Sequence, residues 1–396
     1  MFRKQTPNSL IYVGFSSNNN SAVKAFMNDK WNLTELSFFA INPKTIRLFS
    51  KLKFHKLSNM LSSRIYQSRP KNVNRKSYGM VSIFAPLLNK LGINNGISRK
   101  FLKILYRCDR LYVTRAVKKY DIAVIPSDYL NKYFFTGRSR IIEARWSHPN
   151  LMINRPSVLL DYPIEFSEKD DLWRNIFDDC KNKIDLLITY SQISSDSYIK
   201  AGFPKDRIFC VPLEVNLNTS NTEYSQSANR QRKILYVGRD NLDKGLDIAV
   251  AVAKILGLNL IVVGYFSKTV QVWLKQFSFV EFTGVMPRYE LFKLMQNTEL
   301  YISPGIESFG LSAVEAFLNG MKVISTRFTG ASQWYGNNPN WYIAETLEVN
   351  SMVSTCNHAL KSDSVSSINL HEVDSLHYWQ NISSFLVNQE STRKHN

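Results

Sequence analysis

Short apolar runs alternate with stretches of helical periodicity along the second half of the chain. Each run is bounded by turn residues, a pattern typical of strands that are buried on both faces of a parallel sheet. We expect strands at 234–237, 258–263, 280–283, 300–303, 323–325 and 341–344. Helical patterns over 246–256, 289–295 and 311–318 lie between these runs. The alternation predicts an α/β domain around a parallel sheet.

The first half of the chain shows the same alternation of strand and helix patterns. We expect strands at 9–14, 36–41, 121–126, 141–144, 157–160 and 185–190, and a helix over 191–201. Both halves therefore predict doubly wound α/β domains. Open sheets of this kind bind ligands at the carboxyl ends of their strands, so we expect the ligand in a cleft between the two domains.

A polar segment with few apolar side chains separates the halves and predicts a linker over 214–232. We place the N-terminal domain at 1–213 and the C-terminal domain at 233–375. A tail over 376–396 is expected to return to the N-terminal domain.

Composition supports two domains and excludes several classes of protein. The chain has 396 residues, of which 44% are hydrophobic and 21% charged, enough for two cores and too apolar for a disordered or collagen-like chain. The four cysteines are isolated, which argues against a zinc site and favours a reducing compartment. We find no signal-peptide pattern and no apolar window long enough to span a membrane. We therefore expect a cytoplasmic protein.

The positive charge of the chain is concentrated in its first half. The formal net charge is +18, but residues 1–150 hold 27 Lys and Arg against six Asp and Glu, whereas residues 151–396 hold 23 against 26. Residues 44–119 alone hold 19 bases and one acid. Over 97–119 bases and apolar residues interleave at helical spacing, as in a helix that lies on an anionic lipid surface. The alternatives are an ordinary helix with a solvated cationic face, or binding to nucleic acid.

Two cations follow the expected strand at 234–237. Gly238-Arg239 comes directly after the strand, and Lys244-Gly245 precedes the next helix. Backbone amides of the loop and the helix start, together with Arg239 and Lys244, suit a diphosphate. The segment lacks the sequence of a P-loop and of a dinucleotide fingerprint. The alternative is a pair of solvated surface cations.

A second motif follows the expected strand at 300–303. A loop containing Gly305 leads to a helix expected to begin near Phe309, so amides at the helix start are available to an anion. Glu315, inside that helix, has a carboxylate able to accept from both hydroxyls of a vicinal diol such as a ribose. Glu307 would face the group attached to the phosphate. The alternatives are a surface carboxylate at Glu315 and an acid favoured by the helix dipole at Glu307.

Several motifs in order carry a resemblance. Besides the two loops, the chain has Phe-Thr-Gly-Val-Met-Pro over 282–287, Glu315 eight positions after Glu307, and Gly-Met-Lys-Val-Ile-Ser-Thr over 320–326. Together they resemble the nucleotide-sugar domain of retaining glycosyltransferases with the GT-B fold. The similarity is to the large family of group 1 glycosyl transferases, which are glycosyltransferase family 4-like and carry the E-x7-E motif. The resemblance implies two Rossmann-like domains that face each other across a cleft.

The resemblance also implies roles for individual residues. Arg239 and Lys244 would hold the diphosphate and stabilise it as it leaves. Glu315 would bind the ribose, and the backbone near Met286 would meet the base. The donor sugar and phosphate would contact Glu307, Ser308, Phe309, Gly310 and Leu311. No Asp-x-Asp occurs in the chain, so we expect a metal-independent enzyme without cofactors.

The first half departs from the family pattern at two places. The first loop, where relatives place glycines near the donor phosphate, has only Gly14. Many relatives carry a histidine after the fourth strand, where this chain reads Ile-Pro-Ser-Asp over 125–128. His148 is the nearest substitute and is our candidate for catalysis or acceptor binding, with Arg145 and Asp161 as weaker candidates for the same cleft. A structural histidine is the alternative.

The functional expectation combines the resemblance with the charge distribution. We expect a cytoplasmic glycosyltransferase, peripheral to the inner face of the membrane through its basic N-terminal domain. It would move a hexose from a nucleoside diphosphate sugar to a hydroxyl of a lipid-linked or membrane-associated glycan. The alternatives are a nucleotide-sugar epimerase of similar fold and, less favoured, a nucleic-acid-binding protein. We expect no nucleic acid partner.

Overall fold

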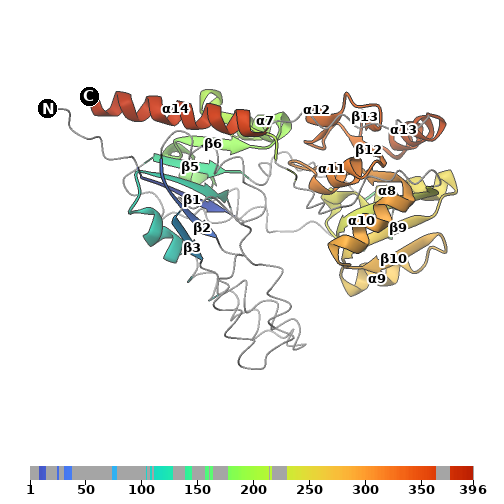
Figure 1. The fold of residues 1–396 in the computed structure, drawn as a ribbon. Helices are drawn as coiled ribbons and strands as arrows, with labels where there is room; N and C mark the ends of the chain where they lie inside the picture. Colours follow the sequence, from blue (N-terminus) through green and yellow to red (C-terminus); the bar gives the residue numbers. More distant parts are fainter. Residues whose placement is uncertain are drawn as a thin grey trace.

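The structure, a computed structural model, describes two parallel sheets (Figure 1). It describes residues 9–14, 25, 31–37, 74–77, 104, 108, 111–127, 139–144, 157–159, 161–163, 177–213, 215, 230–362 and 375–395. In strand order the first sheet runs β3-β2-β1-β4-β5-β6-β7 and the second β10-β9-β8-β11-β12-β13. In each sheet the order reverses beside its first strand, which is the doubly wound topology expected from the sequence. This α/β fold confirms the predicted class.

The first sheet is built from strands spread over residues 9–210. They are β1 (Ser9–Gly14), β2 (Asn32–Ser37), β3 (Asn74–Ser77), β4 (Ile122–Pro126), β5 (Ser139–Glu143), β6 (Leu186–Thr189) and β7 (Ile208–Cys210). The helix α7 (Gln192–Lys200) follows β6 and is capped by the Ser191 side chain, which accepts from the amide of Ser194. Every residue of β4 and β6 is buried, in agreement with their uninterrupted apolar sequence.

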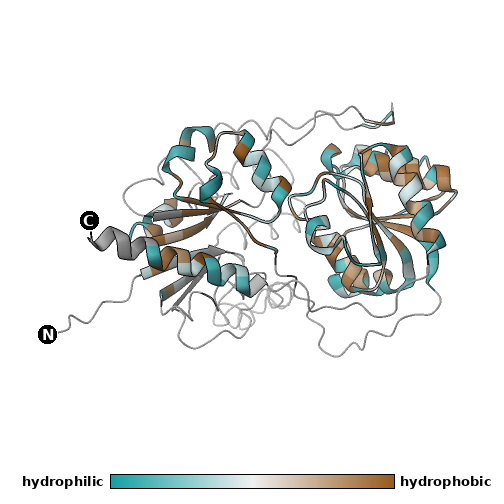
Figure 2. Cartoon of the chain, turned by 90° about the horizontal axis from the view of Figure 1, so that it is seen from above, coloured by the Kyte–Doolittle hydropathy of each residue, from teal (hydrophilic) through white to brown (hydrophobic). Residues whose placement is uncertain are grey.

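The second sheet carries the helices that frame the candidate site. Its strands are β8 (Gln231–Arg239), β9 (Leu260–Tyr265), β10 (Val280–Gly284), β11 (Thr298–Ser303), β12 (Lys322–Thr326) and β13 (Trp341–Ala344). Its helices are α8 (Leu246–Leu256), α9 (Lys268–Leu274), α10 (Arg288–Asn297), α11 (Leu311–Leu318), α12 (Ser332–Tyr335) and α13 (Val349–Lys361). The predicted strands and helices of this half are confirmed. Apolar residues gather on the strands and on the helix faces that cover them (Figure 2).

The last helix, α14 (Ser375–His395), lies along the first sheet (Figure 1). Trp379, Ile382 and Leu386 are buried in one cluster with residues of β1, β2, β4 and β6. The indole nitrogen of Trp31 also donates to the Ser383 hydroxyl, at 3.1 Å. The end of the chain thus packs against the N-terminal domain.

Several predicted boundaries are wrong. The strand expected at 36–41 is β2, which begins at Asn32 because its register with β1 starts there; residues 38–41 lie outside the described part. Residues 157–159, expected as a strand, form a bend that packs against the second domain. Residues 231 and 232, expected in the linker, already belong to β8, and the helix expected near Phe309 begins at Leu311.

Of the basic stretch 44–119, the structure describes 74–77, 104, 108 and 111–119, of which 104, 108 and 111–117 are helical.

Arg230 joins three elements of the second domain, and its replacement should lower stability. One guanidinium nitrogen donates to the carbonyls of Met295 (2.7 Å) and Thr298 (3.0 Å), and another donates to that of Asn319 (2.6 Å). We expect Arg230→Met to lower the free energy of unfolding by about 2–4 kcal/mol, because three carbonyls lose a charged donor. Urea denaturation measures the loss, with the exposed Arg232→Met as control. Equal stability of the two variants would contradict this account.

Candidate active site

The first loop of the candidate site joins β8 to α8. Arg239 ends the strand, Lys244 ends a short 3₁₀ turn, and Gly245 adopts a left-handed backbone (φ 72°) from which α8 starts. A Cβ on Gly245 would lie 3.0 Å from Pro304 and 3.1 Å from the amide nitrogen of Gly305. Glycine is required here because the backbones of two loops approach closely.

The second loop, residues 303–310, joins β11 to α11 and packs against the first. The amide of Ile306 donates to the carbonyl of Asp243 (2.8 Å), so the loops share a backbone hydrogen bond. Gly310 is left-handed (φ 98°), and a Cβ there would meet the Thr329 methyl at 2.8 Å. Because α11 begins at Leu311, the amides of its first turn lie at the carboxyl end of the sheet.

Lys244 and Glu307 bring the two motifs into direct contact. The Lys244 ammonium lies 2.5 Å from a carboxylate oxygen of Glu307, 63 positions along the chain. Their side chains are 17% and 20% exposed, so solvent screens this pair only in part. An ammonium has three donor hydrogens, which leaves Lys244 able to hold an anion while it keeps Glu307.

Glu315 forms a second ion pair, with a residue that the sequence analysis missed. The Arg288 guanidinium lies 2.6 Å from a carboxylate oxygen of Glu315, whose side chain is 13% exposed. Burial raises the pKa of Glu315, and the charge of Arg288 opposes that rise. Arg288 is the first residue of α10, and its guanidinium lies 5.0 Å from the centre of the Phe292 ring. Its position directly after the Gly-Val-Met-Pro run was the sequence signal that could have marked Arg288 as a candidate site residue.

The other predicted site residues are distributed as follows. The exposed Arg239 pairs in register with Tyr265 of β9, and the half-buried Met286 packs beside the second domain's core. Ser308 and Phe309 belong to the 303–310 loop, where Phe309 is buried. Gly14 ends β1 and so belongs to the first sheet.

Three further candidates come from the N-terminal half. Asp161 is described and exposed. Arg145 and His148 lie outside the described residues.

Residues from the N-terminal domain support the 303–310 loop directly. The Ser191 hydroxyl donates to the carbonyl of Ser308 at 2.7 Å. Beside it, the indole nitrogen of Trp334 donates to the carbonyl of Tyr190 at 3.0 Å, and the Tyr190 ring packs edge-on against Phe309. The start of α7 is therefore joined to the loop that carries Glu307.

Two features are absent from the described residues. Among them, no cluster of three or more His, Cys, Asp and Glu side chains is placed to hold a metal ion. No helix in the described part of the chain has the length and apolar content needed to cross a membrane.

Comparison with known families decides what the second domain is. Residues 219–370 match the family model of glycosyl transferases group 1. The second domain is a group 1 glycosyl transferase domain. The matched range contains Arg239, Lys244, Glu307 and Glu315, and therefore both loops of the candidate site.

Solved structures extend the likeness to both domains. HepE of Anabaena in complex with UDP-glucose is 16% identical over 98% of each chain, with a TM-score of 0.51. WaaG, a glycosyltransferase involved in lipopolysaccharide biosynthesis, is 13% identical over 95% of each chain, with a TM-score of 0.52. The lipopolysaccharide outer core galactosyltransferase WaaB is 12% identical over 96% of this chain and 99% of its own, with a TM-score of 0.54. The chain has the GT-B fold. No curated protein matches its sequence.

Proposed function

We propose that this glycosyltransferase moves a hexose from a nucleoside diphosphate sugar to a hydroxyl of a lipid-linked or membrane-associated glycan, with retention of the anomeric configuration. One observation carries the proposal. The group 1 glycosyl transferase domain contains two ion pairs, Lys244–Glu307 and Arg288–Glu315. Lys244 and Glu307 lie on adjoining loops at the carboxyl ends of β8 and β11.

The donor would lie across these two loops. Lys244 and Arg239 would hold the diphosphate together with the first amides of α11, and Ser308 to Leu311 would border the phosphate and sugar. Glu315 would accept from the two ribose hydroxyls, and the backbone at Met286 would meet the base. A donor of this class is supported by HepE, which shares the fold and was solved with UDP-glucose.

The transfer step breaks the bond between the anomeric carbon and the diphosphate oxygen. The departing diphosphate takes the electron pair, so its negative charge increases next to Lys244 and Arg239, which stabilise the transition state. Glu307 would orient the sugar by accepting from its hydroxyls. The acceptor hydroxyl forms the new bond to the anomeric carbon and passes its proton to the departing diphosphate. His148 remains our candidate on the acceptor side, and Gly14 would border the donor from the first sheet.

The acceptor class rests on the charge of the first half. The 27 bases against six acids in residues 1–150 suit an anionic lipid or a pyrophosphate-linked acceptor on the inner face of a membrane.

Co-sedimentation with vesicles tests the proposed binding to an anionic membrane. We expect binding to vesicles that contain phosphatidylserine and none to neutral phosphatidylcholine vesicles, whereas equal binding would contradict the membrane assignment.

The reaction itself is tested by supplying nucleoside diphosphate sugars with and without a membrane lipid extract. We expect release of nucleoside diphosphate that depends on the extract and is insensitive to a chelator, because Lys244 and Arg239 neutralise the leaving group. NMR of the glycan product should show the donor's anomeric configuration. Conversion of the donor to its epimer without extract would instead identify an epimerase.

Arg288 should set the pH range over which the donor binds. Ribose binding requires the ionised Glu315, so affinity should fall as pH drops through the pKa of that carboxyl group. Arg288→Ala removes the charge that opposes the effect of burial, which raises the pKa further. We expect the midpoint of nucleotide binding against pH to move to higher pH. Arg327→Ala, which removes an exposed cation paired with Glu345, is the control. An unchanged midpoint in Arg288→Ala would contradict the prediction.

A further inference from the structure

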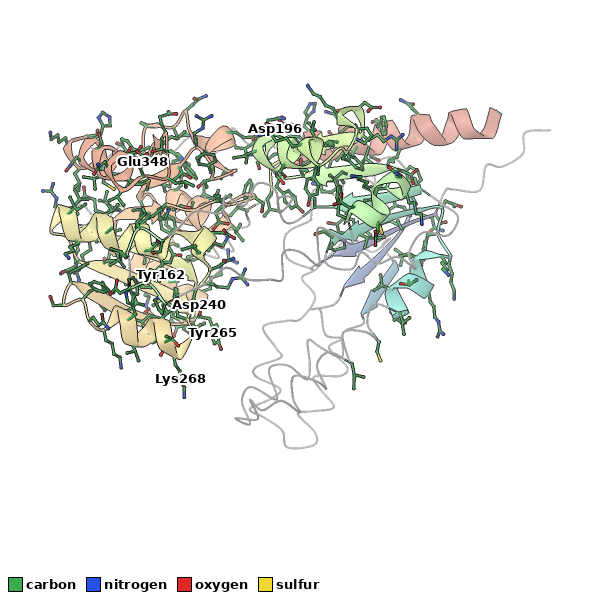
Figure 3. The ribbon with its side chains drawn as sticks, turned by 180° about the vertical axis from the view of Figure 1, so that it is seen from behind. Tyr162, Asp196, Asp240, Tyr265, Lys268 and Glu348 are labelled. Carbon is green, nitrogen blue, oxygen red and sulfur yellow. The ribbon has the colours of Figure 1, made fainter. Side chains whose placement is uncertain are left out.

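A short segment of the N-terminal half packs into the second domain. Residues 157–159 and 161–162, which we call the strap, lie in sequence between β5 and β6 of the first sheet. Figure 3 shows Tyr162 among the elements of the second domain, on the same side as Asp240 and Tyr265. The strap therefore belongs to the first half of the sequence but packs against the second domain.

Apolar contacts hold one end of the strap. Tyr162 is 8% exposed and belongs to the core cluster of the second domain. Its ring packs edge-on against Trp273 of α9, with 4.9 Å between the ring centres. Leu159 packs against the same cluster. A tyrosine buried in this way contributes to the core of a domain that is not its own in sequence.

A buried carboxylate holds the other end. One oxygen of Asp247 accepts from the Ser157 hydroxyl and from the amide of Val158, both at 3.0 Å. Asp247 is fully buried. A buried carboxylate is costly unless donors satisfy it, so these two hydrogen bonds fix the strap relative to α8.

The anchor lies next to the diphosphate loop. Asp247 is in the first turn of α8, three positions after Lys244 and two after Gly245, whose backbone is packed against the 303–310 loop. We propose that Ser157 and Asp247 are positioning residues through which the N-terminal half fixes the start of α8 and, with it, the orientation of Lys244. The inference takes the ligand, a nucleoside diphosphate, from the proposed function and rests on it in that respect.

Ser157→Ala tests the proposal because it removes one donor and leaves the backbone anchor. We expect about tenfold weaker binding of UDP, or of whichever nucleoside diphosphate the wild type binds. We also expect a kcat about tenfold lower, because Lys244 acts most strongly in the transition state. Ser157→Thr keeps the hydroxyl and should restore affinity. Ile324→Val removes one methyl group from the same core, on β12, and is the control for a general loss of stability.

Hydrogen exchange gives a second measurement that needs no ligand. Amides of residues 240–246 should exchange about tenfold faster in Ser157→Ala than in Ile324→Val, while those of α13 exchange alike. Equal exchange in the loop, or equal nucleotide affinity of the two variants, would overturn the positioning role. A wild type that binds no nucleoside diphosphate would overturn the proposed function instead, and the exchange result would still decide the role of the strap.

Discussion

Lys244→Ala is expected to lower kcat by about 10²–10³-fold, with a smaller change in the KM for the donor. The charge on the diphosphate grows as the bond to the sugar breaks, so a cation fixed beside it acts most strongly in the transition state. Lys244 is fixed in this way, because Glu307 holds its ammonium at 2.5 Å and its side chain is only 17% exposed. Initial rates at saturating donor measure the effect.

Two variants separate this effect from a general change in charge. Lys244→Arg keeps the cation and should retain more activity than Lys244→Ala, although its planar guanidinium does not match the ammonium's contact with Glu307. Lys254→Ala removes an exposed cation from the far end of α8 and should leave the rate unchanged. A Lys244→Ala enzyme within twofold of the wild-type rate would show that Lys244 does not stabilise the leaving group.

Glu315→Ala is expected to raise the KM for the donor by on the order of 10²-fold, with less effect on kcat. Two ribose hydroxyls donating to a carboxylate that is 13% exposed would contribute about 3 kcal/mol, and each 1.4 kcal/mol is a factor of ten. The ribose is bound alike in the ground state and the transition state, so its loss appears in KM. Initial rates over a range of donor concentrations provide the measurement.

The control for this second variant is another glutamate of the same domain. Glu345→Ala removes a carboxylate that is 78% exposed, and its kinetics should match those of the wild type. Loss of fold is not expected in Glu315→Ala, because burial already disfavours the ionised carboxylate. A donor KM that is unchanged in Glu315→Ala would remove Glu315 from the ribose site.

The second domain could be predicted from the sequence because three of its strands, β9, β11 and β12, are buried along most of their length. The run at 258–263 predicted β9, whose first four residues are all buried, and the pattern over 246–256 predicted α8 with matching bounds. Parallel strands also place their following loops at one edge of the sheet. The contact between Lys244 and Glu307 fits that expectation, since both follow neighbouring strands, β8 and β11.

The features that could not be predicted depend on contacts between distant parts of the chain. The apolar residues at 157–160 suggested a strand, but Leu159 packs against the core of the other domain. Arg288 directly follows the Gly-Val-Met-Pro run, but nothing in the sequence linked it to Glu315, because the contact spans 27 positions and joins α10 to α11. The same applies to Ser191, whose helix could be predicted but whose bond to Ser308 spans 117 positions.

The central claim is that the two loops at the carboxyl ends of β8 and β11 bind a nucleoside diphosphate. Calorimetry of the full chain with UDP, GDP, ADP and CDP, repeated on Glu315→Ala, tests it most directly. The account predicts that one of the four nucleotides binds with one site per chain and that Glu315→Ala weakens the binding by on the order of 10²-fold. If none of the nucleotides binds the wild type, or if the bound nucleotide retains its affinity in Glu315→Ala, the claim is contradicted.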